Sequence, residues 1–290
     1  MNHEKHLNFF KQFLPIQRVR CLTIHQPKTI AMNNILKICK NILCLFLISF
    51  FVVGLKAQQT QTLNATEIVK TAVNKTLGKT VRTTISMTVV RPGWTKDIRF
   101  KIWTDEYVKA LIQITYPAKD KGQTYLRRDN DLWNWLPNIQ KTIKLSSTLM
   151  SQPWMGSDFS NEDLLNKSSF LNDYEHSFII IENIDDIRCF KLLLTPKADA
   201  AVVWEMVYLW ISVDGFDQLK AEFFTENRQL VRTMSAFDIK NFGEVSIPSR
   251  IIMEPAMKSG HKTEIFVNEY QTNLPIDESF FSIQNMKNLK

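Results

Sequence analysis

Residues 131–165 read DLWNWLPNIQKTIKLSSTLMSQPWMGSDFSNEDLL and hold three of the seven tryptophans of a 290-residue chain. The segment 154–159, WMGSDF, is the most distinctive part, because large apolar side chains flank a polar turn there. Aromatic and methionine side chains provide adaptable apolar surface. The stretch therefore predicts the mouth of an apolar cavity.

The side chains that we expect to line this cavity are large and apolar: Trp103, Trp133, Trp135, Trp154, Met155 and Phe159. Core packing is the alternative for each of them taken singly. The residues between them, Gly156, Ser157 and Asp158, are expected to hold the loop. Gly156 would supply a backbone conformation that other residues avoid, and Asp158 would accept hydrogen bonds from backbone N–H groups.

Alternating apolar and polar residues extend in both directions from this stretch. In residues 81–89, VRTTISMTV, the odd positions are mostly apolar and the even positions are all polar. This period of two is typical of strands with one buried face. Strands are predicted over residues 81–89, 97–103, 107–115, 122–128, 131–136, 139–145, 175–184, 188–195, 202–213, 218–225, 229–239, 245–253 and 262–270.

Only two helices are predicted beside these strands. Residues 64–77 place apolar side chains at helical spacing, and Ser160 with Asp163 forms a capping-box pattern at a second helix start. The sequence therefore predicts a mainly β (α+β) fold, in which a large curved antiparallel sheet forms a half-barrel around a few helices. Residues 202–213 are apolar on both faces, which predicts that a loop or a partner covers the second face.

The first fifth of the chain is expected to be separate from this domain. Residues 32–57 combine a lysine-containing start, an apolar run and a small Ala57, which is the pattern of a signal peptide cleaved near Ala57. An uncleaved membrane anchor is the alternative. We interpret residues 1–31 as an over-extended start and residues 58–290 as one exported domain, which predicts a periplasmic location. Cys44 lies within the apolar run and lacks the small residues that precede a lipid-attachment site.

Charge and cysteine content narrow the classes of function. The formal charge of +7 belongs to the leader, because residues 58–290 hold 28 basic and 28 acidic residues. A near-neutral domain gives no support for nucleic-acid binding. Cys189 is the one cysteine of this domain and stands in an apolar strand, so it is expected to be buried rather than bridged. The domain is expected to be a monomer.

Catalytic and metal-binding patterns are weak. His176 and His261 lack the spacing to other ligands that zinc sites use, and both are expected to be exposed loop residues. Ser157 beside Asp158 lacks the surrounding motif and the histidine that an activated serine needs. We therefore expect no enzyme activity, no metal and no cofactor.

Several short motifs together resemble a known family. They are YP (116–117), KG (121–122), YL (125–126), LWNWLP (132–137), IKL (143–145), MGSDFS (155–160) and EDL (162–164). Over residues 67–281 the chain resembles the outer-membrane lipoprotein-sorting protein family, relatives of the LolA carrier. The resemblance implies a half-barrel closed by helices, a periplasmic carrier whose cavity takes acyl chains, and an inner-membrane lipid exporter as partner.

The hypothesis is therefore a carrier that binds the acyl chains of lipoproteins or other lipids for transfer toward the outer membrane. The alternative is an envelope stress sensor or regulatory module that uses the same fold to detect lipoproteins. An enzyme that acts on lipid, with Ser157, Asp158 or His176 in its chemistry, is the third reading.

Overall fold

The computed structural model describes residues 64–76, 78–105, 108–128, 131–161, 163, 169–200 and 202–289. The predicted start, residues 1–31, and the predicted signal peptide, residues 32–57, lie outside the described residues. The chain from Thr62 to Lys290 forms one compact unit.

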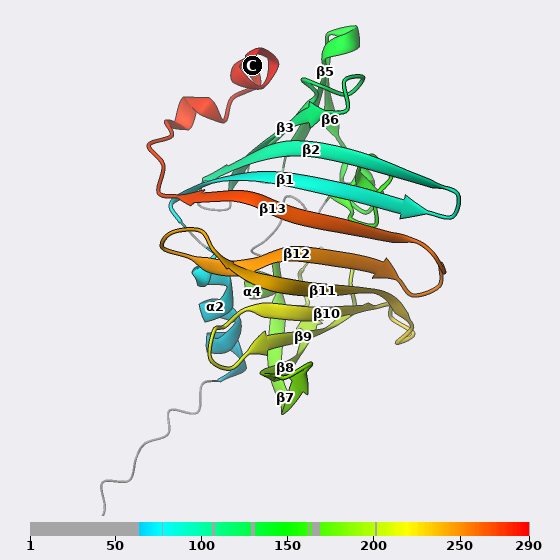
Figure 1. Ribbon diagram of the computed structural model, residues 1–290, viewed down its shortest axis with the longest axis vertical. Coiled ribbons are helices and arrows are strands. Elements are labelled where there is room, and N and C mark those ends of the chain that lie inside the picture. Colours follow the sequence, from blue (N-terminus) through cyan, green and yellow to red (C-terminus); the bar gives the residue numbers. More distant parts are fainter. Residues whose placement is uncertain are drawn as a thin grey trace, which may run out of the picture. The chain divides into compact units, whose positions relative to one another are not determined.

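Thirteen strands form a single sheet in the order β6-β5-β4-β3-β2-β1-β13-β12-β11-β10-β9-β8-β7 (Figure 1). Every neighbouring pair is antiparallel. The strands are β1 (Thr80–Arg91), β2 (Trp94–Asp105), β3 (Lys109–Tyr116), β4 (Thr124–Arg128), β5 (Asp131–Leu136), β6 (Lys141–Leu145), β7 (Tyr174–Ile184), β8 (Ile187–Pro196), β9 (Met206–Ser212), β10 (Gln218–Phe224), β11 (Leu230–Asn241), β12 (Ser246–Pro255) and β13 (Lys262–Thr272). The predicted mainly β, half-barrel fold is confirmed.

The helices are short and few. Helix α2 (Ala65–Lys75) begins at Asn64, whose side-chain oxygen accepts a hydrogen bond from the Glu67 N–H at 2.8 Å. Helices α4 (Ser169–Asn172) and α5 (Ile283–Asn288) are shorter still, and the sequence pattern did not predict either of them. The expected capping box is present, since the Ser160 N–H and hydroxyl both donate to Asp163 Oδ2, at 2.7 and 2.8 Å.

The two faces of the sheet are buried differently. On the inner face, which α2 and α4 cover, the main core gathers the apolar side chains of the alternating strands, such as Ile85, Met87 and Val89 of β1. On the outer face, a smaller cluster forms between α5 and strands β2 to β5, around Leu111 and Met286. Strand alternation explains this division, because successive side chains point to opposite faces.

Strand β9 shows how a sheet can bury both of its faces. Val207 is fully buried in the inner core, and Trp210 is only 2% exposed on the outer face. The Nζ atoms of Lys191 and Lys220, from the two neighbouring strands, lie 4.8 and 4.7 Å from the Trp210 ring centre. Glu182 accepts a hydrogen bond from the indole N–H at 2.6 Å. Long side chains of the sheet, rather than the expected loop or partner, therefore cover this face.

Candidate functional site

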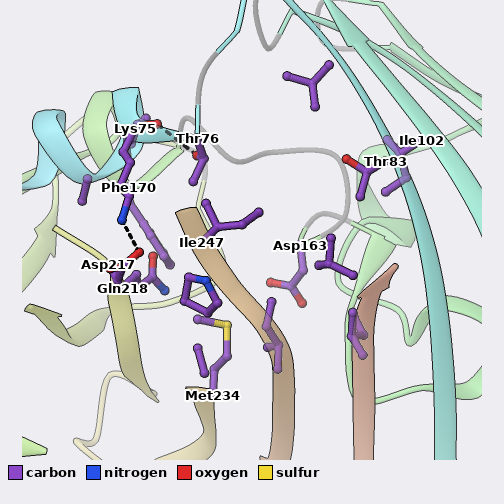
Figure 2. Close-up of a pocket in the computed structure, with 18 of the residues that line it drawn as sticks. Lys75, Thr76, Thr83, Ile102, Asp163, Phe170, Asp217, Gln218, Met234 and Ile247 are labelled. Atoms are coloured by element: carbon purple, nitrogen blue, oxygen red, sulfur yellow. Dashed lines mark hydrogen bonds and ion pairs between the residues drawn. The ribbon is translucent and has the colours of Figure 1, made fainter. Parts of the chain in front are cut away.

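A cavity of about 320 Å³ lies between the inner face of the sheet, α2, α4 and the segment 159–163 (Figure 2). Its wall is mainly apolar and draws on strands that are distant in sequence. Ile85 of β1, Ile102 of β2 and Ile265 of β13 are among the lining residues. A largely apolar, partly open space of this size suits the apolar part of a ligand.

Helix α2 closes one side of the cavity and is fixed there by polar contacts. Lys75, in its last turn, lies 2.5 Å from Asp217 Oδ1, and both residues line the cavity. Asp217 is only 4% exposed, and its backbone N–H donates to Ser212 Oγ at 2.9 Å. The Tyr270 hydroxyl of β13 donates to the Thr76 carbonyl at 2.5 Å. The helix end is therefore tied to both halves of the sheet.

A buried ion pair holds the segment at the other side of the cavity. Arg232 of β11 binds Asp163 in a bidentate manner, with both N–O distances at 2.6 Å. The Arg232 guanidinium carbon also lies 4.4 Å from the ring centres of both Trp204 and Phe223. Such planar, paired contacts are the strongest that arginine makes. The negative charge of Asp163, whose side chain lines the cavity, is therefore balanced by the Arg232 guanidinium.

A second ion pair anchors the preceding turn. Asp158 Oδ2 accepts hydrogen bonds from Arg91 Nη1 at 2.9 Å and from the Thr263 hydroxyl at 2.7 Å. These partners are side chains of β1 and β13, so the expectation that Asp158 accepts backbone N–H groups is corrected. Arg91 Nη2 also donates to the Gly156 carbonyl at 2.8 Å. The loop-holding role expected for Asp158 is thus performed through the ends of two strands.

The WMGSDF segment forms a tight turn with unusual backbone angles. Met155 has φ of 52° and Gly156 has φ of 82°, so the expected special conformation of Gly156 is present and extends to its neighbour. The Ser157 hydroxyl contacts the backbone N–H and carbonyl of Phe159, each at 3.2 Å. This pairing places Ser157 in the turn, with its hydroxyl engaged by the backbone.

The predicted cavity residues separate into two groups. Phe159 lines the cavity. Trp154 is 2% exposed in the inner core, where its ring packs edge-on against Phe100 and Tyr125 at 5.0 and 5.8 Å, and Met155 packs against the same core. Burial there raises the pKa of Tyr125 to about 12.

The other three predicted lining residues lie on the outer face. Trp103, Trp133 and Trp135 pack against the cluster that α5 covers, so the cavity wall differs from the prediction at these positions. The reason is strand parity. Leu132 of β5 points into the inner core, so the odd positions that follow it point to the opposite side.

Sequence reasoning missed most of the lining and all of its buried charges. The apolar lining on β1 and β13 carries a visible signal, since those strands alternate clearly. Arg232 stands within the apolar run of β11, LVRTM. A charged residue at an inward position of this strand could have indicated a buried ion pair. Lys75 and Asp217 lie 142 residues apart, and nothing local indicates that they meet.

The remaining chemistry-bearing groups have structural partners. His176 lies in β7 and is half-buried, which corrects the expected exposed loop position. Its Nε2 lies 2.7 Å from the Phe170 carbonyl and its Nδ1 lies 3.2 Å from the Thr66 hydroxyl, and burial lowers its pKa. Cys189 is fully buried, as expected, and burial raises its pKa.

The described residues contain neither a metal-binding cluster nor a membrane-spanning helix. Within them, no group of three or more His, Cys, Asp or Glu side chains could hold a metal ion. None of the helices in that part of the chain has the length and apolar character needed to cross a membrane.

Comparisons with known proteins match the chain to one family model and to several solved structures of similar fold. A family model described as "Uncharacterized protein" matches residues 106–288, and none of the curated proteins matches the chain. A DUF1329 family protein from Desulfovibrio piger is 20% identical with a TM-score of 0.71, over 77% of this chain and 97% of that chain.

Two further solved structures share the fold. A LolA superfamily protein from Nitrosomonas europaea is 25% identical with a TM-score of 0.66, over 77% of this chain and 99% of that one. A putative outer membrane lipoprotein-sorting protein domain from Vibrio parahaemolyticus is 20% identical with a TM-score of 0.68, over 77% and 98%. These similarities extend over nearly the whole length of each solved chain.

Proposed function

We propose that this chain, which belongs to the uncharacterised family whose model matches residues 106–288 and has a LolA-like fold, carries the acyl chains of lipids or lipoproteins. The observation that carries the proposal is the apolar cavity of about 320 Å³ beneath α2. Burial of apolar surface stabilises such a complex by roughly 25 cal/mol per Å², before the cost of ordering the chain is subtracted. The similarity to a lipoprotein-sorting domain supports the same class of cargo.

The charges around the cavity favour an uncharged ligand segment. Lys75 pairs with Asp217, Asp163 pairs with Arg232, and Lys109 pairs with carboxylates outside the cavity. Each charged residue of the described cavity wall thus already has an opposite charge beside it. A buried charge that lacked a partner would attract a charged ligand group, whereas these pairs leave the apolar wall to select the ligand. The acyl chain would enter, and the head group would remain outside.

The test is mass spectrometry of lipid extracted from gently purified protein, with two matched variants. Thr83 lines the cavity and points into it in Figure 2, so Thr83→Phe fills part of the space. Thr84 is the next residue of β1 and faces the other side, where its hydroxyl donates to Glu269. We expect co-purifying or reloaded lipid in the wild type and in Thr84→Phe, and a several-fold loss in Thr83→Phe. Absence of lipid from all three proteins would refute carriage.

In this proposal the protein carries lipid without catalysing a reaction. It works in the periplasm, receives its cargo from an inner-membrane lipid exporter and transfers it toward the outer membrane. The Ser157 hydroxyl contacts backbone groups of its own turn, and His176 contacts Phe170 and Thr66, so neither side chain faces a reacting partner in the described residues. Hydrolysis of lipid esters by the purified protein, lost in Ser157→Ala, would overturn the part of the proposal that excludes catalysis.

A regulatory or sensor module is the second candidate, and the edge strand β7 favours it. Four consecutive apolar residues of this strand, Phe178, Ile179, Ile180 and Ile181, are 40–50% exposed. Exposed apolar edge strands are sites where another chain can pair. Pull-down with wild type and Ile180→Lys would discriminate: an envelope signalling protein retained only by the wild type supports this candidate, and a lipid exporter retained by both supports carriage.

A further inference from the structure

Three neighbouring hairpin turns form an exposed surface at one end of the sheet. They comprise the turns and adjoining strand ends of the β1–β2, β3–β4 and β12–β13 hairpins, residues 91–97, 116–122 and 254–262; we refer to them as the basic hairpin end. The β1–β2 and β12–β13 turns project at the same end of the sheet in Figure 1. A Cβ placed on Gly260 would lie 3.5 Å from Pro92 Cγ, and Lys96 Nζ lies 3.9 Å from Asp120 Oδ2, so the three turns touch.

Large apolar and aromatic side chains are exposed on this surface. Met257 is 76% exposed, Trp94 is 50% exposed and Tyr116 is 43% exposed. The guanidinium carbon of Arg99 lies 5.0 Å from the Tyr116 ring centre. Each of the three turns thus presents one such side chain to solvent. Tryptophan and tyrosine favour the boundary between water and lipid, because their rings are apolar and their tips are polar.

The charge of the same surface is positive. Apart from Arg91, which pairs with the buried Asp158, the basic hairpin end contains five basic residues and three carboxylates, whereas the domain as a whole is near neutral. Lys119, Lys121 and Lys258 are exposed and form no ion pair with any residue that the structure describes. The apolar edge of β7 is different, because Glu175, Glu182 and nearby aspartates flank it.

We propose that the basic hairpin end docks on an anionic lipid bilayer, with Trp94, Tyr116 and Met257 entering the interface while the lysines face lipid phosphates. Apolar insertion and electrostatic attraction act together at such surfaces. The site does not depend on cargo in the cavity, and it goes beyond the carrier function.

The docking surface is in direct contact with the loop beside the cavity. Arg91 Nη2 donates to the Gly156 carbonyl at 2.8 Å, and Lys96 Nζ donates to the Met155 carbonyl at 3.3 Å. Phe159, three residues after Gly156, lines the cavity. A docked protein would therefore hold the loop side of its cavity toward the bilayer.

The experiment is co-sedimentation of the purified protein with phosphatidylcholine vesicles that contain or lack phosphatidylglycerol. We expect binding to the anionic vesicles and much weaker binding to the neutral ones, with affinity falling as salt is added. Lys258→Ala should weaken binding about fivefold, the effect of roughly one lost surface lysine. Trp94→Ser combined with Met257→Ser should weaken it about tenfold or more, because the inserted apolar area is lost.

Ile180→Ser is the matched control, since Ile180 is also 50% exposed but lies on the acidic edge of β7. Binding by Ile180→Ser equal to that of the wild type supports the proposal. Equal binding to both kinds of vesicle, an unchanged affinity of the Trp94/Met257 double variant, or an equal loss in the control would overturn it. Lipid load distinguishes this proposal from carriage: the double variant should keep its load, whereas Thr83→Phe should lose load and still bind vesicles.

Discussion

Replacement of Arg232 by methionine tests whether the buried pair with Asp163 organises the cavity wall. The Arg232 side chain is 6% exposed and that of Asp163 is 18% exposed, so water screens their attraction weakly. Methionine would preserve much of the packing against the Trp204 and Phe223 rings. It would remove both hydrogen bonds to the carboxylate and the one to the Asp158 carbonyl.

Removal of one partner from a buried pair leaves the other charge without compensation, and this costs about 3–5 kcal/mol of the free energy of unfolding. The compact unit falls in the size range where 1 kcal/mol lowers Tm by about 2–4 °C, so we expect a drop of roughly 10 °C. Asp163 keeps its hydrogen bonds from Ser160, which favours the lower end of the range.

Urea denaturation followed by tryptophan fluorescence measures this loss. Asp163→Asn and the double variant complete a cycle, and the double variant should be less destabilised than the sum of the two single variants. Arg250→Met is the control, because Arg250 pairs with Asp238 and Glu264 at the surface and should change the midpoint little. A loss below about 1 kcal/mol for Arg232→Met, or an additive cycle, would refute the reasoning.

Three further changes test other parts of the structure. Lys75→Met should destabilise the protein by about 2–4 kcal/mol in urea denaturation, because it leaves the buried Asp217 carboxylate without its ammonium partner; an unchanged midpoint would contradict this. Burial lowers the pKa of His176, so the unfolded state binds the proton more tightly and stability should fall as pH drops below about 6.5. Tm measured against pH should flatten in His176→Gln, and an unchanged pH dependence would contradict this. Gly156→Ala should cost about 1 kcal/mol by the same denaturation, because its φ of 82° is strained for alanine although nothing lies within 4 Å of the added carbon; a neutral result would show that the turn adapts.

The sheet could be predicted because its signal is local. In β1 the inward positions are apolar or threonine while the outward positions are polar, and the same alternation marks most other strands. Asp185 and Asn273 have positive φ in the turns and loops, a conformation that Asn and Asp adopt more readily than most residues. Most of the strand order can also be predicted, because strands that are consecutive in the sequence and joined by short turns pair in antiparallel fashion. The closure of β1 on β13 joins the two halves of the chain and has no such local signal.

The site could be predicted only in part, because alternation does not identify which face is the inner one. Their large apolar side chains predict that Trp133 and Trp135 line the cavity, whereas the structure places both on the outer face beneath α5. That assignment needed knowledge of α5, whose sequence, IQNMKN, carries little helical pattern. Phe159, chosen for its large apolar side chain, does line the cavity, and it follows a turn in which Gly156 has positive φ.

The contacts that hold the cavity wall also indicate where it can open. The segment between Asp158 and Asp163 is attached by two ion pairs to Arg91 and Arg232, and its release would expose both buried charges. Helix α2 is attached at its end by the Lys75–Asp217 pair and by the hydrogen bond from Tyr270 to Thr76, and its apolar face packs in the inner core. Displacement of α2 breaks one ion pair, whereas release of the segment breaks two, so fewer charges lose their partners when α2 moves. We expect cargo to enter by movement of α2, and hydrogen exchange should show faster opening of α2 than of the segment between Asp158 and Asp163 in the empty protein. Equal protection of the two elements would contradict this order of stability.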